Sequence, residues 1–486
     1  MRPTSNRGSA GGSLDVPPLR LLAGRSALYA LAGALNKVLA LITIPILTRL
    51  LTPDGFGLAD LATGLSALLT LVALFGADIP AAQLAATRPA QHRSVYATYV
   101  AFVSALAVAI TLVVLVGAGQ VATTIWGAAE QQSLAQWTAV LIAVTGIRGA
   151  TVTVLRLAGR AQVFAAVAVV ELIVDLVLSV TLVALGSGPI GVVQAYVVGN
   201  LVGLAIGLAS GRDLLGAKPH LDMVPFLARR GAAYLPAGLA FVAADYGLRY
   251  LVANFSGLES AGQLATALRI ASVMGLATAG FTLAWGPYMA SQPQGARRAR
   301  QAGFMISVYG GLALIVGALI SLFGPEAIEV IAGSAFVPGA AALPGLLAAA
   351  AVAGATHVAV VATGLGGRLG LVAGAVLVGA AFEVVAGFLL LPVFGLAGIG
   401  MAAFLGNATA LAIAIWSAGD GLVLDRRVVA LAVLVTGAAV ALLAMLAEPQ
   451  WLVARTLLAI GILAAAATAL MLRLPARAVS GRGVDN

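Results

Sequence analysis

Cysteine is absent from this sequence, and its 486 residues include only three histidines. The lack of cysteine excludes disulfide bonds and thiolate metal sites, and three scattered histidines do not suit a zinc site, so we expect no metal centre. Charge is scarce as well: charged residues make up 9% of the chain, against about 25% in typical soluble domains. A chain so poor in charge cannot provide the polar surface of a soluble protein.

Most of the sequence is apolar instead. Hydrophobic residues account for 61% of it, and the mean hydropathy is +1.05. A transmembrane helix needs about 20 mostly apolar residues. The apolar runs between clusters of charged and turn residues predict about fourteen such helices. The expected spans are 26–48, 57–79, 95–118, 134–155, 163–185, 189–210, 231–254, 263–286, 302–323, 340–364, 370–392, 396–417, 428–447 and 451–472.

The chain is basic, with a formal net charge of +9, which in a soluble protein would suggest a nucleic-acid partner. Here the lysines and arginines lie in short loops, and with a cytoplasmic N-terminus 21 of the 23 loop cations face the cytoplasm. This bias predicts a multi-pass protein of the cell (inner) membrane with both termini cytoplasmic and no nucleic-acid partner. The longest outer connection, about 119–133, is too short for a catalytic domain, so we do not expect an enzyme.

The sequence repeats itself once. Residues 188–208 align without gaps on 395–415, and the copies share a Gly-Asn step, Gly199-Asn200 and Gly406-Asn407. Chance similarity in a chain rich in Gly, Ala and Leu is the alternative, but both copies form the sixth helix of their half. Two parallel six-helix lobes are a transporter plan. The predicted organisation is a disordered cytoplasmic tail (1–24), an N-terminal lobe (25–210), a cytoplasmic linker (211–230), a C-terminal lobe (231–418), two further helices (428–472) and a cytoplasmic tail (473–486).

Five stretches carry a family resemblance. The first, "LTRLLTPDGFGLADLATGLSALLTLVALFGAD", contains an Arg-Leu-Leu-x-Pro-x-x-Phe-Gly turn between two helices, and 231–272, 281–291, 323–350 and 389–406 follow in the expected order. The sequence resembles the polysaccharide-biosynthesis (lipid-linked oligosaccharide) flippases of the MOP superfamily over about 25–420. It departs from them in the seventh helix, where Leu248 replaces the usual aspartate before Arg249, and in the eleventh, where "FEVVAG" replaces an asparagine-rich stretch.

The resemblance implies an all-α polytopic membrane protein of about 14 transmembrane helices, with its two lobes facing each other across a central cavity. It implies that a polyprenyl-diphosphate-linked oligosaccharide is moved from the cytoplasmic to the outer leaflet by alternating access. The implied partners are this lipid-linked glycan, membrane lipids, and polysaccharide synthesis and export proteins. The alternatives are another MOP-type carrier, such as a multidrug/cation antiporter or the lipid II flippase, and more remotely a membrane glycan polymerase or ligase.

Four cations fall within predicted spans: Lys37, Arg148, Arg249 and Arg269. A charge at mid-bilayer costs about 2.5–3.5 kcal/mol on insertion scales, so it faces a water-filled cavity or a partner. Arg249 and Arg269 lie toward the outer half of consecutive helices, which favours their convergence on a diphosphate. The alternative for each cation is a buried carboxylate partner that braces the bundle.

The acids inside the spans suggest a second role. Asp245 lies four residues before Arg249 on one helix face, where an intrahelical ion pair or a head-group site is expected. Glu171, Asp175 and Glu383 are candidate carboxylates for H⁺ or Na⁺ coupling, or structural groups neutralised by Arg148 or Lys37. No cofactor is expected. Arg49 and Asp60 flank the Pro/Gly turn, and we expect them to pair with each other at the outer interface.

Overall fold

The computed structural model describes residues 42–276, 278, 281, 285, 296–364 and 369–417. These residues form helices and contain no strand. Seven helical stretches among them are long and apolar enough to cross a membrane, and two of these, Ala161–Ser210 and Ala373–Ser417, contain 50 and 45 residues. Because about 20 residues make one crossing, each of these two can cross twice. The chain is therefore an all-α, multi-pass membrane protein.

Parts of the predicted helix count cannot be compared with the structure. Most of the span expected at 26–48, with Lys37, and all of the spans expected at 428–447 and 451–472 lie outside the described residues. The count of fourteen therefore stays a prediction.

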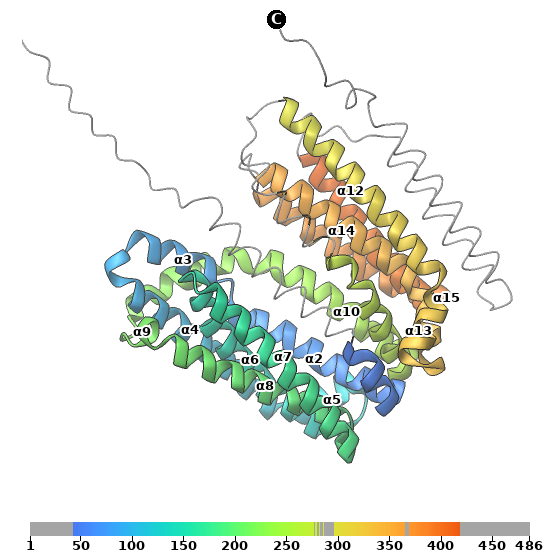
Figure 1. Cartoon of the computed structure of the whole chain (residues 1–486), viewed down its shortest axis with the longest axis horizontal. Helices are drawn as coiled ribbons and strands as arrows, with labels where there is room; N and C mark the ends of the chain where they lie inside the picture. Colours follow the sequence, from blue (N-terminus) through green and yellow to red (C-terminus); the bar gives the residue numbers. More distant parts are fainter. Residues whose placement is uncertain are drawn as a thin grey trace, which may run out of the picture.

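The described helices form two groups joined by one long helix (Figure 1). The long helix is α10 (Val224–Ala271), which lies between the groups and is broken at Gly257, where the backbone is non-helical (φ 89°, ψ 170°). The N-terminal group contains α2 (Pro53–Leu74), α3 (Asp78–Thr87), α4 (His92–Val116), α5 (Ala118–Trp126), α6 (Gln132–Leu157), α7 (Ala161–Leu182), α8 (Gly188–Ser210) and α9 (Arg212–Leu215). The C-terminal group contains α12 (Ala296–Leu322), α13 (Gly324–Ala332), η5 (Ser334–Ala342), α14 (Leu343–Gly364) and α15 (Leu369–Ser417).

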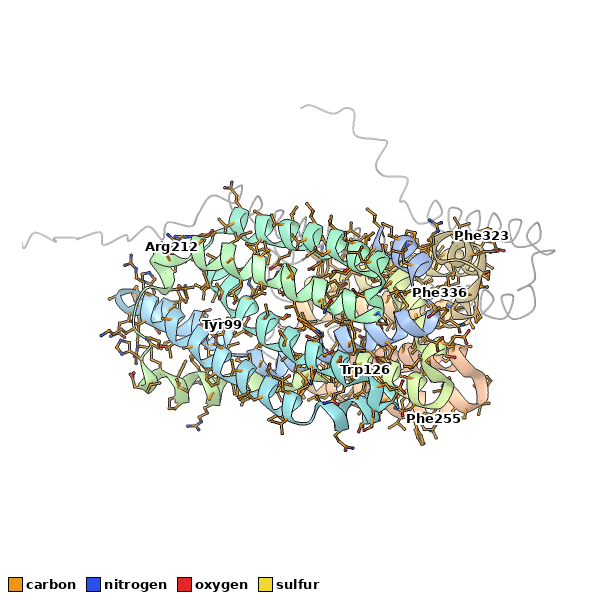
Figure 2. The ribbon with its side chains drawn as sticks, turned by 90° about the horizontal axis from the view of Figure 1, so that it is seen from below. Tyr99, Trp126, Arg212, Phe255, Phe323 and Phe336 are labelled. Atoms are coloured by element: carbon orange, nitrogen blue, oxygen red, sulfur yellow. The ribbon has the colours of Figure 1, made fainter. Side chains whose placement is uncertain are left out.

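The two groups approach each other at one end and diverge toward the other (Figure 1). We call the first the α13 end, where α5 and α13 lie, and the second the α3 end, where α3 and α9 lie. Figure 2 shows Trp126 and Phe336 at the α13 end and Arg212 at the α3 end. At the α13 end the rings of Phe56 and Phe336 meet edge to face, with centroids 5.8 Å apart. The groups are therefore packed together there.

Glycine allows α2 and α10 to come close at the α13 end. A Cβ atom on Gly57 would lie 2.9 Å from the backbone nitrogen of Gly262, closer than a side chain permits.

The residues Thr52 and Pro53 explain why α2 begins at this point of the chain. Pro53 occupies the first helical position, and the Thr52 hydroxyl accepts a hydrogen bond from the Gly55 N–H at 3.3 Å.

The sequence repeat has a structural counterpart at the break between two helices. Gly188 opens α8 with φ 56° and ψ −144°, and Gly395 breaks α15 with φ 57° and ψ −139°. Only glycine adopts this conformation readily. Further along, the side-chain amide of Asn200 donates to the Tyr196 carbonyl at 2.8 Å, and that of Asn407 donates to the Ala403 carbonyl at 2.9 Å. The two copies therefore fold alike.

Two local predictions differ from the structure. The eighth span was expected to run without a break over 263–286, but α10 ends at Ala271 and a turn follows at Ser272 and Val273. The Ser272 hydroxyl donates to the Arg269 carbonyl at 2.7 Å, which satisfies one of the carbonyls left free at the helix end. The outer connection 119–133 holds the short helix α5, because Ala118, Ala122 and Trp126, four residues apart, form one buried stripe.

Candidate functional site

The candidate site lies where α2 packs against α10, between the two groups. Asp60 of α2 is only 5% exposed. Its Oδ2 accepts a hydrogen bond from Arg249 Nη1 at 3.1 Å, and its Oδ1 accepts one from Arg269 Nη2 at 3.4 Å. One buried carboxylate therefore bridges two guanidinium groups that come from the two halves of α10.

A fourth charge completes this cluster. Asp245 lies one turn before Arg249 on α10, and its Oδ2 accepts from Arg249 Nη2 at 2.9 Å. We call Asp60, Asp245, Arg249 and Arg269 the α2–α10 quartet. Its two carboxylates and two guanidinium groups have no net charge when all are ionised. Pairing of this kind offsets the cost of holding charges at membrane depth.

One stripe of α2 shapes the quartet. Phe56, Asp60 and Gly64 are four residues apart and therefore share a helix face. The guanidinium carbon of Arg269 lies over the Phe56 ring, 4.3 Å from the ring centroid, in a cation–π contact. A Cβ atom on Gly64 would come within 3.1 Å of the Tyr246 ring. Glycine at this position therefore leaves room for the face of α10 that carries Arg249.

The expected pairing of Asp60 with Arg49 is wrong. Asp60 is buried and pairs with Arg249 and Arg269, whereas Arg49 is exposed. The physical reason is the position of Asp60 in α2. The helix starts at Pro53, so Asp60 lies about 10 Å along the axis, two turns away from the Pro/Gly turn. At that depth its partners come from the facing helix.

Arg148 lies elsewhere, inside the N-terminal group. It reaches across from α6 to α7 and forms a two-pronged ion pair with Glu171. Glu171 in turn lies against Gly203 of α8, where no side chain would fit. Arg148 thus neutralises Glu171, and a neutralised structural group is one of the two roles expected for this carboxylate.

Asp175, one turn after Glu171, lacks such a partner within the described part of the chain. Its Oδ1 is buried and accepts no hydrogen bond there. The side chain lies against Gly199 of α8. It also lines a cavity of about 100 Å³ that Tyr196 and Arg269 border. Asp175 is therefore a carboxylate that faces the region of the quartet.

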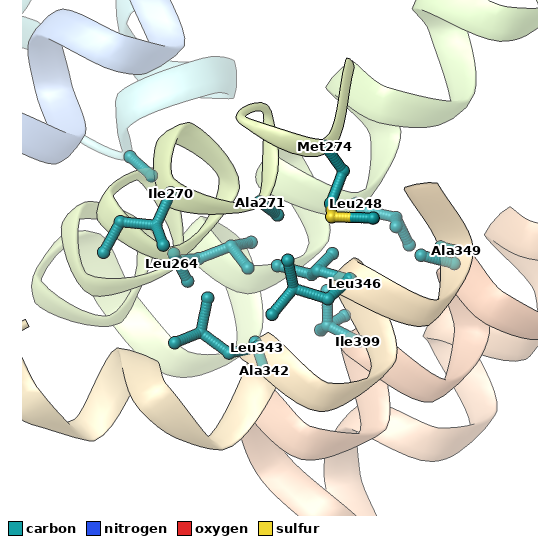
Figure 3. Packing of buried hydrophobic residues seen from close by; sticks show 14 of the residues in the cluster. Leu248, Leu264, Ile270, Ala271, Met274, Ala342, Leu343, Leu346, Ala349 and Ile399 are labelled. Carbon is teal, nitrogen blue, oxygen red and sulfur yellow. The ribbon is translucent and has the colours of Figure 1, made fainter. Parts of the chain in front are cut away.

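A second cavity lies in the C-terminal half. It has a volume of about 210 Å³, and its polar lining comes from Asp245, Ser272, Glu383 and Asn407. The other lining residues are mainly apolar; Leu248, Leu264, Leu346 and Ile399 appear in Figure 3. Glu383 lies against Gly406, the repeat partner of Gly199. Each half thus places one carboxylate against the glycine of its Gly-Asn step.

The α3 end carries a larger opening. A cavity of about 460 Å³ lies beside the first turns of α10 and is lined by Pro225, Phe226, Arg229 and Arg230. The Arg230 guanidinium lies over the Phe226 ring, 5.8 Å from its centroid. Cationic side chains therefore stand at the end where the two groups diverge.

Two ion pairs link segments of the N-terminal group at the α3 end. Arg160, which follows α6, donates to the Asp213 carboxylate and to the Ser210 carbonyl. The hydrogen bond from Arg160 holds the pKa of Asp213 below its ordinary value. Arg156 pairs with Asp78 at 3.2 Å nearby. The contacts of Arg160 tie the segment after α8 to the turn between α6 and α7, and the pair of Arg156 with Asp78 ties α6 to α3.

The family profile described as "Polysaccharide biosynthesis protein" matches residues 23–292, more than half of the chain. The chain belongs to the polysaccharide biosynthesis protein family. The match covers α2 to α10 and so includes all four residues of the quartet. A search of curated proteins finds no match.

Solved transporters share the fold of this polysaccharide biosynthesis protein. "Lipid II flippase MurJ, inward closed conformation" matches with a TM-score of 0.72 at 9% identity, over 90% of this chain and 97% of that one. An inward-facing multidrug resistance MATE family transporter of the MOP superfamily matches at 0.62 and 17% identity, over 79% and 97%. A MOP superfamily transporter from Pyrococcus furiosus matches at 0.53 and 18%, over 82% and 94%. The fold is that of the MOP superfamily.

The structure thus brings together three of the predicted site residues of this family member, Asp245, Arg249 and Arg269, and adds Asp60. The sequence offered one signal for Asp60, a lone charge two turns into an apolar helix. Arg148 and Glu171 form a separate pair. Lys37 lies outside the described residues. No cluster of three or more His, Asp or Glu side chains suited to a metal occurs in the described ranges.

Proposed function

We propose that this protein is a flippase that moves a polyprenyl-diphosphate-linked oligosaccharide from the cytoplasmic to the outer leaflet by alternating access. The observation that carries the proposal is the convergence of Arg249 and Arg269 on one buried point between the two groups. Paired guanidinium groups suit the oxygens of a diphosphate. Membership of the polysaccharide biosynthesis family supports a glycan as the attached group.

In this mechanism the α3 end faces the cytoplasm, with both termini on that side of the cell membrane. The lysine and arginine bias of the loops supports this orientation. The head group enters between the diverging groups, past Arg229 and Arg230, and reaches Arg249 and Arg269. Lys37 of the first helix supplies a third cation, and Arg148 braces the N-terminal group through Glu171. Closure of the α3 end and opening of the α13 end then expose the glycan outside.

Asp175 and Glu383 are the coupling carboxylates in this proposal. Each lies against the glycine of a repeated Gly-Asn step, one in each half of the chain. A carboxylate that forms no ion pair among the described residues and lies in an apolar setting can take up a proton, or bind Na⁺ with nearby oxygens. Uptake of H⁺ or Na⁺ at these sites would shift the equilibrium between the arrangement open at the α3 end and the arrangement open at the α13 end. The reaction needs no cofactor and makes or breaks no covalent bond, so the protein is not an enzyme.

The alternative carriers differ from this one in the ligand. A multidrug or cation antiporter would bind a cation, and the lipid II flippase would carry a peptidoglycan precursor. The quartet has no net charge and so does not distinguish an anionic ligand from a cationic one; membership of the polysaccharide biosynthesis family favours the lipid-linked glycan. The lipid-linked glycan, membrane lipids, and the polysaccharide synthesis and export proteins that make and use the glycan are the partners that the proposal requires.

The test is the pool of polyprenyl-diphosphate-linked glycans, resolved by mass, in cells with and without this protein. Deletion should cause one complete repeat unit to accumulate on the cytoplasmic side. The wild-type chain should reverse the accumulation, and Arg249→Gln should not. An unchanged pool in cells that make such lipids, together with ion-driven efflux of a cationic drug, would contradict the proposal and favour an antiporter.

A further inference from the structure

The arginines proposed to bind the diphosphate already hold an anion. The two oxygens of Asp60 are divided between them, Oδ2 to Arg249 and Oδ1 to Arg269. A phosphate group that bridged the same two guanidinium groups would take the same hydrogen bonds. A diphosphate that takes these hydrogen bonds therefore displaces Asp60.

The charge balance of the quartet decides which ligands can do this. Its four charges cancel, so there is no spare positive charge to attract an anion. A ligand with one negative charge only exchanges one anion for another at the two arginines. The exchange leaves the Asp60 carboxylate, which is 5% exposed, without its ion-pair partners, and an unpaired buried charge is unfavourable. A diphosphate brings a second charge and more oxygens. Arg249 Nε, which is buried and has no acceptor among the described residues, is available to one of them.

Asp245 is less suited than Asp60 to this competition. It is on the same helix as Arg249, one turn away, and its side chain is 45% exposed beside the C-terminal cavity. Asp60 is on the opposite helix, α2. Its pairs with Arg249 and Arg269 are the ion pairs that join α2 to α10 in the described part of the chain. Displacement of Asp60 therefore also loosens the contact between α2 of the N-terminal group and α10, which packs against α14 and α15 of the C-terminal group.

We propose that Asp60 is an internal substitute for the substrate's diphosphate and the residue that sets selectivity for a diphosphate over a single phosphate. This rests on the proposed flippase function, because it assigns a role to Asp60 at the same site. Substrate binding and release of the α2–α10 ion pairs become one event. An empty carrier, with Asp60 in place, keeps its groups together at the α13 end.

The test compares two probes on the purified full-length chain in lipid nanodiscs. In one probe a farnesyl chain is joined to N-acetylglucosamine through a diphosphate, and in the other through a single phosphate. The wild-type chain should prefer the diphosphate. Asp60→Asn should tighten binding of both probes, the monophosphate more, so that the preference falls about tenfold, equivalent to about 1.4 kcal/mol. Asp54→Asn, at an exposed position of the same helix, should change neither, and Asp60→Glu should keep the preference.

The outcomes separate this proposal from the proposed function. If Asp60→Asn leaves the preference unchanged while Arg249→Gln and Arg269→Gln abolish binding, the role of Asp60 is overturned and the flippase stands. If the two arginine variants bind the diphosphate probe as the wild type does, both proposals fail.

A second measurement does not depend on a variant of Asp60. Because the chain contains no cysteine, Glu130→Cys and Val330→Cys at exposed positions of the α13 end can carry spin labels without other changes. The diphosphate probe should lengthen the distance between the labels, and the monophosphate probe at the same concentration should not. An equal response to both probes, or no response to a bound diphosphate probe, would overturn the proposal.

Discussion

Gly188 and Gly395 adopt the same backbone conformation, with φ 56° and 57° and ψ −144° and −139°. They are the first residues of the two repeat copies, 188–208 and 395–415. A side chain at either position would be strained, because L residues rarely adopt a positive φ of this kind. The two breaks turn each long apolar stretch into a pair of helices that pack side by side.

Alanine at either glycine should therefore destabilise the fold. We expect Gly188→Ala and Gly395→Ala each to cost about 1–3 kcal/mol, seen as a lower thermal midpoint in detergent. Gly374→Ala is the matched control, because Gly374 is in α15 and a Cβ there would meet nothing within 4 Å. Equal midpoints for Gly395→Ala and Gly374→Ala would show that the break needs no glycine.

The Arg148–Glu171 pair should behave as a structural element. Removal of one partner leaves a buried charge, so Glu171→Gln should cost about 3–5 kcal/mol, whereas the double change Arg148→Met with Glu171→Leu should restore much of the loss. Thermal unfolding measures both. Arg156→Gln, which breaks the exposed pair with Asp78, should cost under about 1 kcal/mol. A stable Glu171→Gln variant with impaired substrate binding would instead assign Arg148 to the cavity.

The two repeat-related carboxylates should matter for coupling and not for ligand binding. Asp175→Asn and Glu383→Gln remove the group that takes up H⁺ or Na⁺, so transport driven by an ion gradient should fall by about tenfold or more. Binding of the diphosphate probe should remain. Glu329→Gln, at an exposed position of α13, is the control. Unchanged gradient dependence in both variants would remove these carboxylates from the coupling mechanism.

Acid should weaken the ion pair between Asp213 and Arg160. The hydrogen bond from Arg160 lowers the pKa of Asp213 in the folded protein below its ordinary 3.8. The stabilisation is thus fully present above pH 3.8 and is lost as the pH falls through the lowered pKa. Asp213→Asn should lower the thermal midpoint slightly at neutral pH, and the difference from the wild type should vanish in strong acid. Glu130→Gln, at an exposed position, should have no such pH-dependent effect, and a constant difference for Asp213→Asn would contradict the pairing.

Local rules predicted much of the helical framework. Apolar runs bounded by charges and glycines gave spans close to α4, α6, α7 and α8, because length and composition limit where a membrane helix can lie. The spacing of Asp245 and Arg249 predicted their ion pair, because residues four apart meet on a helix surface. The repeated Gly-Asn step predicted two equivalent helices. Each of these depends on neighbours in the sequence.

Local rules do not predict which charged side chains pair between different helices. Glu171 and Asp175 share a helix face, and the sequence does not say which of them Arg148 reaches; that depends on how α6 and α7 are rotated against each other. The sequence predicts an ion pair between Asp60 and Arg49, because these two residues flank one turn. The close approach of α2 to α10, which Gly57 and Gly262 permit, brings Arg249 and Arg269 to Asp60 instead.

Reconstituted transport tests the central claim most directly. The purified chain would be placed in liposomes with a fluorescent polyprenyl-diphosphate-linked oligosaccharide, and the fraction reaching the outer leaflet would be followed by an enzyme that cannot cross the bilayer. The wild type should speed translocation, and Arg249→Gln should slow it by about 10–100-fold, the loss expected for a charge-assisted contact. If translocation by the wild type equals that of protein-free liposomes, or if Arg249→Gln transports at the wild-type rate, the account of a diphosphate carried by this cationic site is contradicted.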